Sequence, residues 1–302
     1  MDPILQYILD YLEQENPAHG ARVRLRLEAE DSRQLARASA FFARYKSHIE
    51  TAGRTLEYGL DCYLKLVARM VHERMEFLRS GKYASSSFAE VEKQIYSNPD
   101  VFEYHMHGLV FAQFFWPEQA ARFRFFSEHI GAELAHAKNY LEIGGGHALY
   151  LLEASDQAPP DLKLTLLDIS ESSMKLARGI ARGSPVEFRL MNIFEYVPDT
   201  RFDFITLGEV LEHVEDPRAL LEVVRQLLAP GGHAFISSPA NSPTIDHIYL
   251  FHSAEEIRTM LNECGFTVLR EKIQFSENVS EEKARKLKVA TMYAAFVQPD
   301  VR

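Results

Sequence analysis

The spacing of apolar residues changes once along the chain, near residue 138. Before that point apolar side chains recur three or four positions apart, as in Ile4, Ile8 and Tyr11, and few glycines interrupt the pattern. This is the period of an amphipathic helix with one buried face. We therefore predict that residues 1–135 form an all-helical N-terminal domain.

Local signals indicate where some of these helices begin and end. Ser87-Phe88-Ala89-Glu90 matches a capping box, in which a serine and a glutamate cap the first helical turn. Asn98-Pro99 and Trp116-Pro117 are typical of helix starts, because proline fits the first turn. Gly81 is typical of a position just past a helix end.

After residue 138, short apolar runs alternate with helical segments. The runs are NYLEI, KLTLLD, VEFRL, FDFITL, HAFISS, FTVLRE and TMYAAFV. Strands that alternate with helices form a parallel sheet covered on both faces. We predict that residues 136–302 form an α/β domain, with a short helix within ENVSEEKARKLK and a last strand that runs antiparallel at or near the sheet edge.

Composition and charge narrow the range of partners. The 302 residues are 46% hydrophobic, and 33 Lys and Arg against 43 Asp and Glu give a net charge of -10, which repels a nucleic-acid backbone. No apolar run approaches the ~18–20 residues of a membrane helix, and the first residues do not resemble a signal peptide. The chain has two cysteines, Cys62 and Cys264, which form no CxxC motif; this sparse use of cysteine is usual for proteins of a reducing compartment. We expect a cytoplasmic protein that binds neither nucleic acid nor a membrane; the oligomeric state is left open.

A glycine-rich turn follows the first predicted strand. Within Glu142-Ile143-Gly144-Gly145-Gly146, the glycines permit positive φ angles and let a ligand lie against bare backbone at a helix start. Asp168 ends the second strand beside this turn, where a carboxylate can accept both ribose hydroxyls. Leu149 replaces the third glycine of a dinucleotide site, and Glu142 would repel phosphates. The turn therefore favours a cationic nucleoside such as S-adenosylmethionine, which has no phosphate.

From about residue 139 onward the sequence resembles the class I S-adenosylmethionine-dependent methyltransferases. The matching motifs, in order, are LEIGGGHA, LLDIS, MNIFE, FDFITLGEVLEHVEDP and LLAPGGHAFISSP. The resemblance implies a Rossmann-like, doubly wound sheet of seven strands in the order 3-2-1-4-5-7-6, with strand 7 antiparallel. It also implies S-adenosylmethionine as cofactor and in-line transfer of its methyl group to an O, N or S atom.

The resemblance further implies which residues bind the cofactor. They are Glu142, Gly144, Gly145, Gly146, Asp168, Ile169, Asn192, Ile193, Gly208 and Glu209. The first turn would surround the methionine portion, Asp168 would bind the ribose, and Ile169 would lie against the adenine. Asn192 and Ile193 would hold the adenine edge; many relatives have aspartate at the first of these, and asparagine still donates and accepts hydrogen bonds there. The last two residues would face the methyl-transfer region.

Glu209, Glu212 and His213 lie three and four residues apart, which is one face of a helical turn. Some methyltransferases hold a divalent metal with this ExxEH spacing, whereas in others the same residues fix the loop to the sheet. A hard, oxygen-binding cation takes more carboxylates than this segment supplies. We therefore expect no metal ion.

Two histidines in the apolar segment VFEYHMHGLVFAQFFW are candidate catalysts. Buried histidines need hydrogen-bond partners, and His105 and His107 point to different helix faces because they lie two residues apart. A hydrogen-bonded core histidine is the alternative interpretation. We predict that His105, beside Tyr104, faces the acceptor and takes its proton, with His107 as the second candidate. A thioether acceptor would need no base.

The candidate acceptor-binding residues are Arg74, Tyr104, His247 and Tyr249. Glu73-Arg74 interrupts a helical apolar pattern, which usually marks a solvated face and otherwise a clamp for a substrate carboxylate or ammonium. Asp246-His247-Ile248-Tyr249 follows the fifth strand, where relatives often contact their acceptor; a plain surface loop is the alternative. The aromatic residues expected to be helix-packing core are Phe111, Phe114, Phe115, Trp116, Phe123, Phe125 and Phe126.

These observations favour a helical domain that covers the cofactor cleft and encloses a small acceptor, such as an amino acid, an organic acid or a specialised metabolite. Two alternatives remain. Methylation of RNA or protein would need an open cleft with a basic rim, and no Arg- or Lys-rich stretch lies near the glycine turn. A catalytically silent cofactor-binding scaffold is the other, although Glu142, Gly144, Gly146 and Asp168 are all present.

Overall fold

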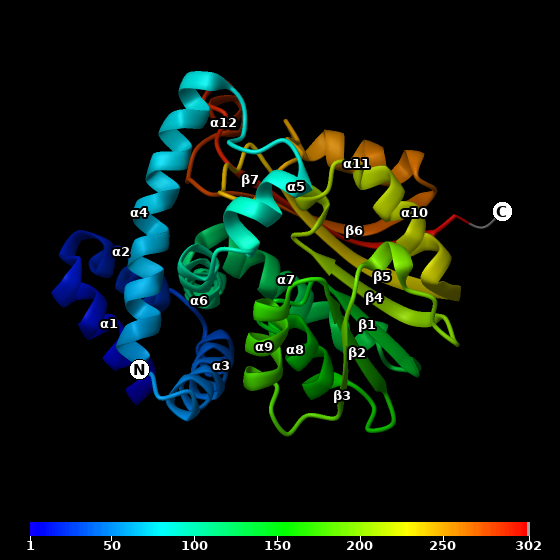
Figure 1. Cartoon of the computed structure of the whole chain (residues 1–302), viewed down its shortest axis with the longest axis horizontal. Helices are drawn as coiled ribbons and strands as arrows, with labels where there is room; N and C mark the ends of the chain where they lie inside the picture. The colour runs from blue at the N-terminus through cyan, green and yellow to red at the C-terminus, as the bar shows by residue number, and fades with distance from the viewer. Residues whose placement is uncertain (301–302) are drawn as a thin grey trace.

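The computed structural model describes residues 1–300 and shows a helical N-terminal half packed beside an α/β half (Figure 1). The helices of the first half are α1 (Pro3–Glu15), α2 (Pro17–Glu28), α3 (Ser32–Thr51), α4 (Leu56–Ser80), α5 (Phe88–Val91), the π-helix η1 (Glu92–Tyr96), α6 (Pro99–Phe115) and α7 (Pro117–Glu133). The expected domain boundary falls in the segment between α7 and the first strand.

The predicted starts of α6 and α7 are confirmed, since each begins at a proline. Gly81 ends α4 in the left-handed conformation, with φ of 71°. The capping box is only half formed. The Ser87 side chain accepts a hydrogen bond from the Glu90 amide, but the Glu90 carboxylate reaches one residue further back and accepts from the Ser86 amide at 3.0 Å.

The described residues of the second half form a seven-stranded sheet in the order β3-β2-β1-β4-β5-β7-β6, as predicted. Its strands are β1 (Asn139–Ile143), β2 (Lys163–Asp168), β3 (Val186–Leu190), β4 (Phe202–Gly208), β5 (Leu228–Ala240), β6 (Phe266–Phe275) and β7 (Thr291–Pro299). β7 pairs antiparallel with both β5 and β6, and the remaining pairs are parallel.

Helices cover both faces of the sheet, and its central strands β1 and β4 are mostly buried. The helices of this half are α8 (Leu149–Gln157), α9 (Glu171–Ile180), α10 (Pro217–Leu227), α11 (Ala254–Glu263) and α12 (Glu281–Lys286), with short 3-10 turns η2 (Ile193–Glu195) and η3 (Leu211–His213). The helix expected within ENVSEEKARKLK is α12. Among residues 1–300, no helix combines the length and the apolar character needed to cross a bilayer.

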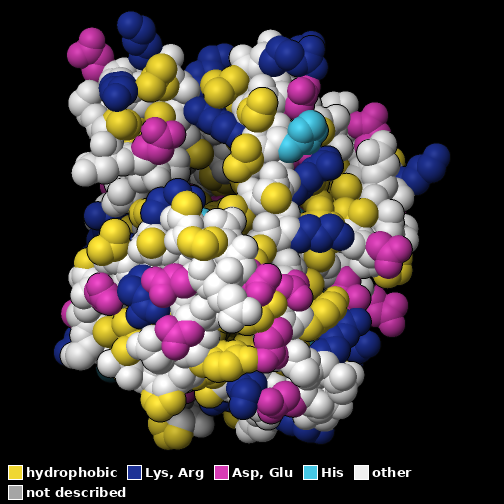
Figure 2. Space-filling model, turned by 90° about the vertical axis from the view of Figure 1, so that its left-hand side faces the viewer, with side chains coloured by type: hydrophobic (Ala, Val, Ile, Leu, Met, Phe, Trp, Pro, Cys, Tyr) yellow, Lys and Arg dark blue, Asp and Glu magenta, His cyan; other side chains and the backbone are white. Residues whose placement is uncertain are grey.

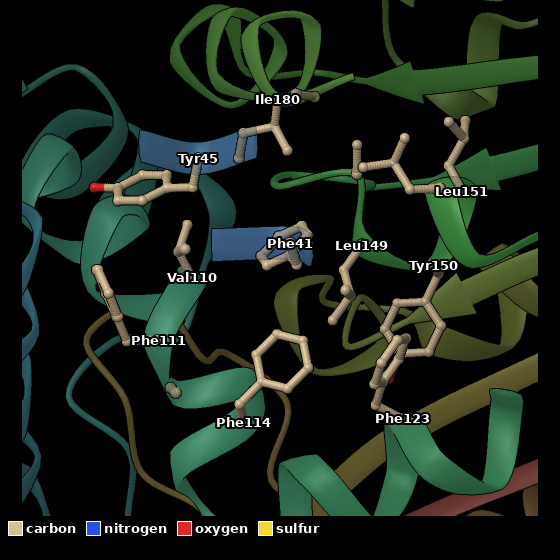
Figure 3. Packing of buried hydrophobic residues seen from close by; sticks show 14 of the residues in the cluster. Phe41, Tyr45, Val110, Phe111, Phe114, Phe123, Leu149, Tyr150, Leu151 and Ile180 are labelled. Carbon is tan, nitrogen blue, oxygen red and sulfur yellow. The ribbon is translucent and has the colours of Figure 1, made fainter. Parts of the chain in front are cut away.

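One hydrophobic core joins the N-terminal helices to one face of the sheet. It runs from α1 through α3 and α6 to α8 and α9, and includes Phe204 and Phe235 of the sheet. Figure 3 shows the middle of this core, where Phe114 of α6 lies between Phe41 of α3 and Phe123 of α7. The predicted aromatic core is confirmed except at Trp116, which is only partly buried and lines a cavity. The shared core fixes how the helices face the strand ends.

Candidate active site

A cavity of about 1200 Å³ lies between the N-terminal helices and the carboxyl ends of β1, β2 and β4. Its lining includes every residue expected to bind the cofactor: Glu142, Gly144, Gly145, Gly146, Asp168, Ile169, Asn192, Ile193, Gly208 and Glu209. Arg74, His105 and His247 also line it. Tyr104, His107 and Tyr249 do not.

The turn after β1 has no room for larger side chains. Gly144 has φ of 69°, and a β-carbon there would lie 2.6 Å from a methyl carbon of Val210. A β-carbon on Gly145 would lie equally close to Leu166. The Gly146 amide donates a hydrogen bond to Asp168 at 3.3 Å, which ties the turn to the end of β2. All three glycines line the cavity, so a ligand there would meet bare backbone, as the sequence predicts.

Two buried carboxyl groups meet at this turn. Glu142 is 3% exposed, and burial raises its pKa to about 8; its Oε2 atom has no hydrogen-bond partner. Burial also raises the pKa of Asp168, to about 6, although this carboxylate accepts from the Ser170 amide at 2.8 Å. An unpartnered buried oxygen suits a cationic group, and a carboxylate that keeps acceptor capacity suits hydroxyls. These residues fit S-adenosylmethionine, through its ammonium and its ribose.

The other side of the cleft fits a flat apolar ring. Ile169 and Phe194 leave large apolar side chains exposed there. The side-chain oxygen of Asn192 accepts from the Phe194 amide at 3.0 Å, so the NH₂ of Asn192 remains as a donor. This arrangement is compatible with an adenine between the ends of β2 and β3.

The ExxEH residues do not share one helical face. Glu209 has φ of 58°, which prevents a helix from starting there, and its carboxylate pairs with Arg122 at 2.9 Å. Glu212 points elsewhere, is fully buried and accepts from the Ser238 hydroxyl at 2.7 Å. These residues do not form the helical arrangement that a metal site would need, because a left-handed residue just after β4 reorients the chain before η3, and Glu212 bonds to β5 instead.

Glu212, His213 and His247 bring one potential ligand atom each within 4.8 Å of one another. The Nδ1 atoms of the two histidines bond to backbone carbonyls, of Asp246 at 3.0 Å and of Ser242 at 2.7 Å. Ca²⁺ takes about 6–8 oxygen ligands, which one carboxylate and two imidazoles do not supply. The expectation of no metal ion stays a prediction.

His105 faces a buried carboxylate. Its Nε2 atom lies 3.5 Å from Asp246 Oδ2, and its Nδ1 atom has no hydrogen-bond partner. Burial by itself would raise the pKa of Asp246, but the neighbouring His105 and His213 hold it well below its usual range. An ionised Asp246, which also accepts from Thr244 at 2.7 Å, can therefore orient the His105 ring.

Three predicted residues lie away from the cavity. His107 bonds Tyr45 at 2.9 Å, and burial lowers its pKa to about 4, so it has the core role that we kept as the alternative. Tyr104 carries Lys65 over its ring, at 4.0 Å from the centroid. Tyr249 packs against Phe251, with the ring centroids 4.7 Å apart. The spacing of residues along a helix or a loop does not reveal which side of that segment faces the cavity and which packs against another element.

Of the two interpretations of Glu73-Arg74, a plain solvated face does not fit the structure, and the role of Arg74 toward an acceptor stays a prediction. Glu73 is buried and pairs with Arg69 at 2.6 Å. Arg74 lines the cavity and donates to the Leu287 carbonyl at 2.9 Å. The loop after α12 covers this face of α4, a contact between segments far apart in the sequence (Figure 1).

Sequence reasoning missed Arg122, Tyr96 and Asp246. Arg122 of α7 is 2% exposed, lines the cavity and also bonds Gln113 at 2.7 Å. Tyr96 ends the π-helix and lines the cavity; burial, then the nearby Asp246, raises its pKa well above the usual value. Arg122 follows Ala121 in an amphipathic helix and looks like an ordinary polar position there, and no local sequence pattern indicates a π-helix. Asp246 belongs to the loop after the fifth strand that the sequence analysis singled out, but no role was predicted for this residue.

Comparison with known proteins agrees with this geometry. A family model described as a methyltransferase domain matches residues 116–271, more than half of the chain. A ubiquinone biosynthesis O-methyltransferase of Bordetella avium is 34% identical over 110 residues, which are 35% of this chain and 44% of that protein. The corresponding enzyme of Marinobacter nauticus is 28% identical over 130 residues, 41% and 53% of the two chains. The matches thus span about half the length of these relatives.

Solved structures share the fold. The N-methyltransferase NodS from Bradyrhizobium japonicum, in complex with S-adenosyl-L-homocysteine, has a TM-score of 0.51 at 19% identity, covering 71% of this chain and 99% of NodS. The mitomycin 7-O-methyltransferase MmcR has a TM-score of 0.51 at 15% identity, covering 76% and 67%. From the family match, the strand order and the glycine turn, we conclude that this chain belongs to the class I S-adenosylmethionine-dependent methyltransferases.

Proposed function

We propose that the chain transfers a methyl group from S-adenosylmethionine to an O, N or S atom of a small molecule held between the helices and the sheet. One observation carries this proposal. A single cavity joins the cofactor-type residues at the strand ends to a wall formed by α4, α6 and α7. When bound, S-adenosylmethionine supplies an electrophilic methyl group on a sulfonium sulfur.

The residues of the cavity divide the task of holding the cofactor. Asp168 would accept hydrogen bonds from the ribose, and the free oxygen of Glu142 would accept from the ammonium. Arg122 is a buried cation beside the start of α8, 5.3 Å from the centroid of the Tyr150 ring, and it would balance the carboxylate of the methionine portion. The helices would exclude water and align the acceptor, the main contributions that such a site makes to rate.

His105 would act as base when the acceptor is a hydroxyl or an ammonium. Asp246 faces its Nε2 atom, so the proton would be taken at Nδ1, which has no partner. A thioether sulfur carries no proton, so with such an acceptor this histidine would not act as a base. Enclosure by the helical half supports a small acceptor over RNA or protein.

Calorimetric titration with S-adenosylhomocysteine tests the cofactor site. Asp168→Ala should weaken binding by ~1.5–3 kcal/mol, because the ribose loses charge-assisted hydrogen bonds. Asp199→Ala removes an exposed carboxylate outside the cavity and should leave affinity unchanged. Equal affinity of wild type and Asp168→Ala would refute the site. Transfer of labelled methyl groups from S-adenosylmethionine into a metabolite extract would then identify the acceptor.

A further inference from the structure

The two walls of the cavity differ in chemistry. The wall at the strand ends carries the carboxyl groups and bare backbone described above. The opposite wall, from α4 and α6, is mainly apolar and includes Leu66, Val67, Met70, Val71, Phe102 and Leu109. An apolar lining with a few placed polar groups is the usual form of a site for a largely apolar ligand.

The apolar wall continues to the surface along α4. Val71 is 58% exposed and Met75 is 65% exposed, and both also line the cavity, so they lie at its mouth. Figure 2 views the molecule from the side of the N-terminal helices and shows hydrophobic side chains gathered beside a hollow in the upper half of this face. Leu78, one turn further along α4, is 55% exposed but does not line the cavity.

The buried end of this wall is polar. His105 and Asp246 are 2% and 5% exposed, and both line the cavity. The α4 side offers one cation, Arg74, whose Nη2 donates to the Leu287 carbonyl and whose Nη1 has no hydrogen-bond partner. Glu277, whose charge favours the charged form of Arg74, also lines the cavity and balances this cation. A single reactive polar group at the buried end, with an apolar remainder, fits these walls.

The cavity is also larger than one ligand requires. Pockets for drug-sized molecules measure about 300–1,000 Å³, and this one measures about 1200 Å³. It therefore has room for the cofactor and for a second molecule.

We infer that the acceptor is an amphiphile. Its single reactive polar group lies at His105 and Asp246, and its apolar body, an alkyl chain or a fused ring system, lies along α4 and reaches the surface between Val71 and Met75. This inference rests on the proposed function and adds the substrate class to it.

A series of para-alkylphenols tests the apolar wall. Protein saturated with S-adenosylhomocysteine is titrated with para-ethylphenol, para-butylphenol and para-hexylphenol. Each buried methylene should tighten binding by up to about fourfold. Affinity that does not change with chain length would overturn the inference.

Two α4 variants locate the binding surface. Val71→Asp places a charge at the cavity mouth and should weaken para-hexylphenol binding about tenfold or more. Leu78→Asp places the same charge on an equally exposed position outside the cavity and should have no effect. Equal effects of the two variants, or no effect of either, would overturn the inference. Both variants should bind S-adenosylhomocysteine as wild type does; a wild-type protein that fails to bind it would instead contradict the proposed function.

Discussion

At the scale of single residues, Glu142 couples burial to ligand chemistry. Burial raises its pKa to about 8, with a further contribution from Asp168, so in the free protein the carboxyl group is mostly neutral at pH 7. A bound ammonium favours the ionised form, because opposite charges attract strongly where water is excluded. Binding of such a ligand should therefore release a proton.

Cofactor affinity should accordingly depend on pH. Below the pKa of Glu142, its carboxyl proton must be removed before the carboxylate can pair with the ligand's ammonium. The affinity for S-adenosylhomocysteine should therefore rise by up to tenfold per pH unit from pH 7 and level off above about pH 8. Calorimetry in two buffers of different ionisation enthalpy measures both the affinity and the released proton. Glu142→Gln should bind more weakly and lose the dependence in this range; an unchanged pH dependence in that variant would assign it to another group.

The two histidines of α6 provide an internal control for catalysis. His105→Ala should leave S-adenosylhomocysteine affinity intact and reduce turnover of a hydroxyl or amine acceptor by ~10²–10⁴-fold. Asp246→Asn, which keeps the shape but removes the charge that orients His105, should lower kcat more than it changes KM. His107→Gln alters the histidine outside the cavity and should turn over normally once its folding is verified by circular dichroism. Unaltered turnover of His105→Ala would remove this residue from the active site.

At the scale of elements, the acceptor wall depends on how closely α4 and α6 approach. At Gly108 of α6 a β-carbon would lie 2.9 Å from the Leu66 β-carbon and 3.0 Å from the Cys62 carbonyl oxygen. Neither atom is the flexible end of a side chain. A glycine in the middle of a helix costs about 1 kcal/mol relative to alanine, so packing explains its presence there.

Two glycine variants separate packing from helix propensity. Gly108→Ala should lower the free energy of unfolding by ~1–3 kcal/mol, because it forces α6 away from α4. Gly131→Ala in α7 meets only the end of the Gln157 side chain, so it should be neutral or stabilising by up to about 1 kcal/mol. Denaturant titration measures both. If Gly108→Ala is as stable as Gly131→Ala, the helices do not touch as described.

At the scale of the whole molecule, the helices and one face of the sheet share a core. Phe126 of α7 is fully buried and packs against Tyr150, Phe235 and Phe296, so it joins α8 to two strands. The cavity lies between the two halves, and its shape therefore depends on their remaining packed together.

Unfolding should be a single transition for both halves. The one tryptophan, Trp116, reports on the helical half by fluorescence, and far-ultraviolet circular dichroism reports on the whole chain. The two curves should coincide, and Phe126→Ala should shift both by ~3–5 kcal/mol. A fluorescence transition well separated from the circular dichroism transition would show that the halves unfold independently.

Much of the fold and of the cofactor site could be predicted from local sequence. The apolar runs coincide with the strands, and the glycine turn with Asp168 lines the cavity as expected. The residues that sequence reasoning misplaced or missed depend on orientation across the molecule. His107, a predicted catalyst, faces Tyr45 where His105 faces the cavity, and Arg122, for which no role was predicted, is buried against Glu209.

The sequence by itself determined the order of helices and strands and the position of the glycine turn, because periodicity, proline, glycine and backbone sterics act over a few residues. Only the tertiary structure decided that His105 meets Asp246, that Arg122 pairs with Glu209, and that an apolar wall of α4 faces the cofactor turn. Those contacts join residues more than sixty positions apart, and their geometry depends on the angles at which helices pack on the sheet through a shared core.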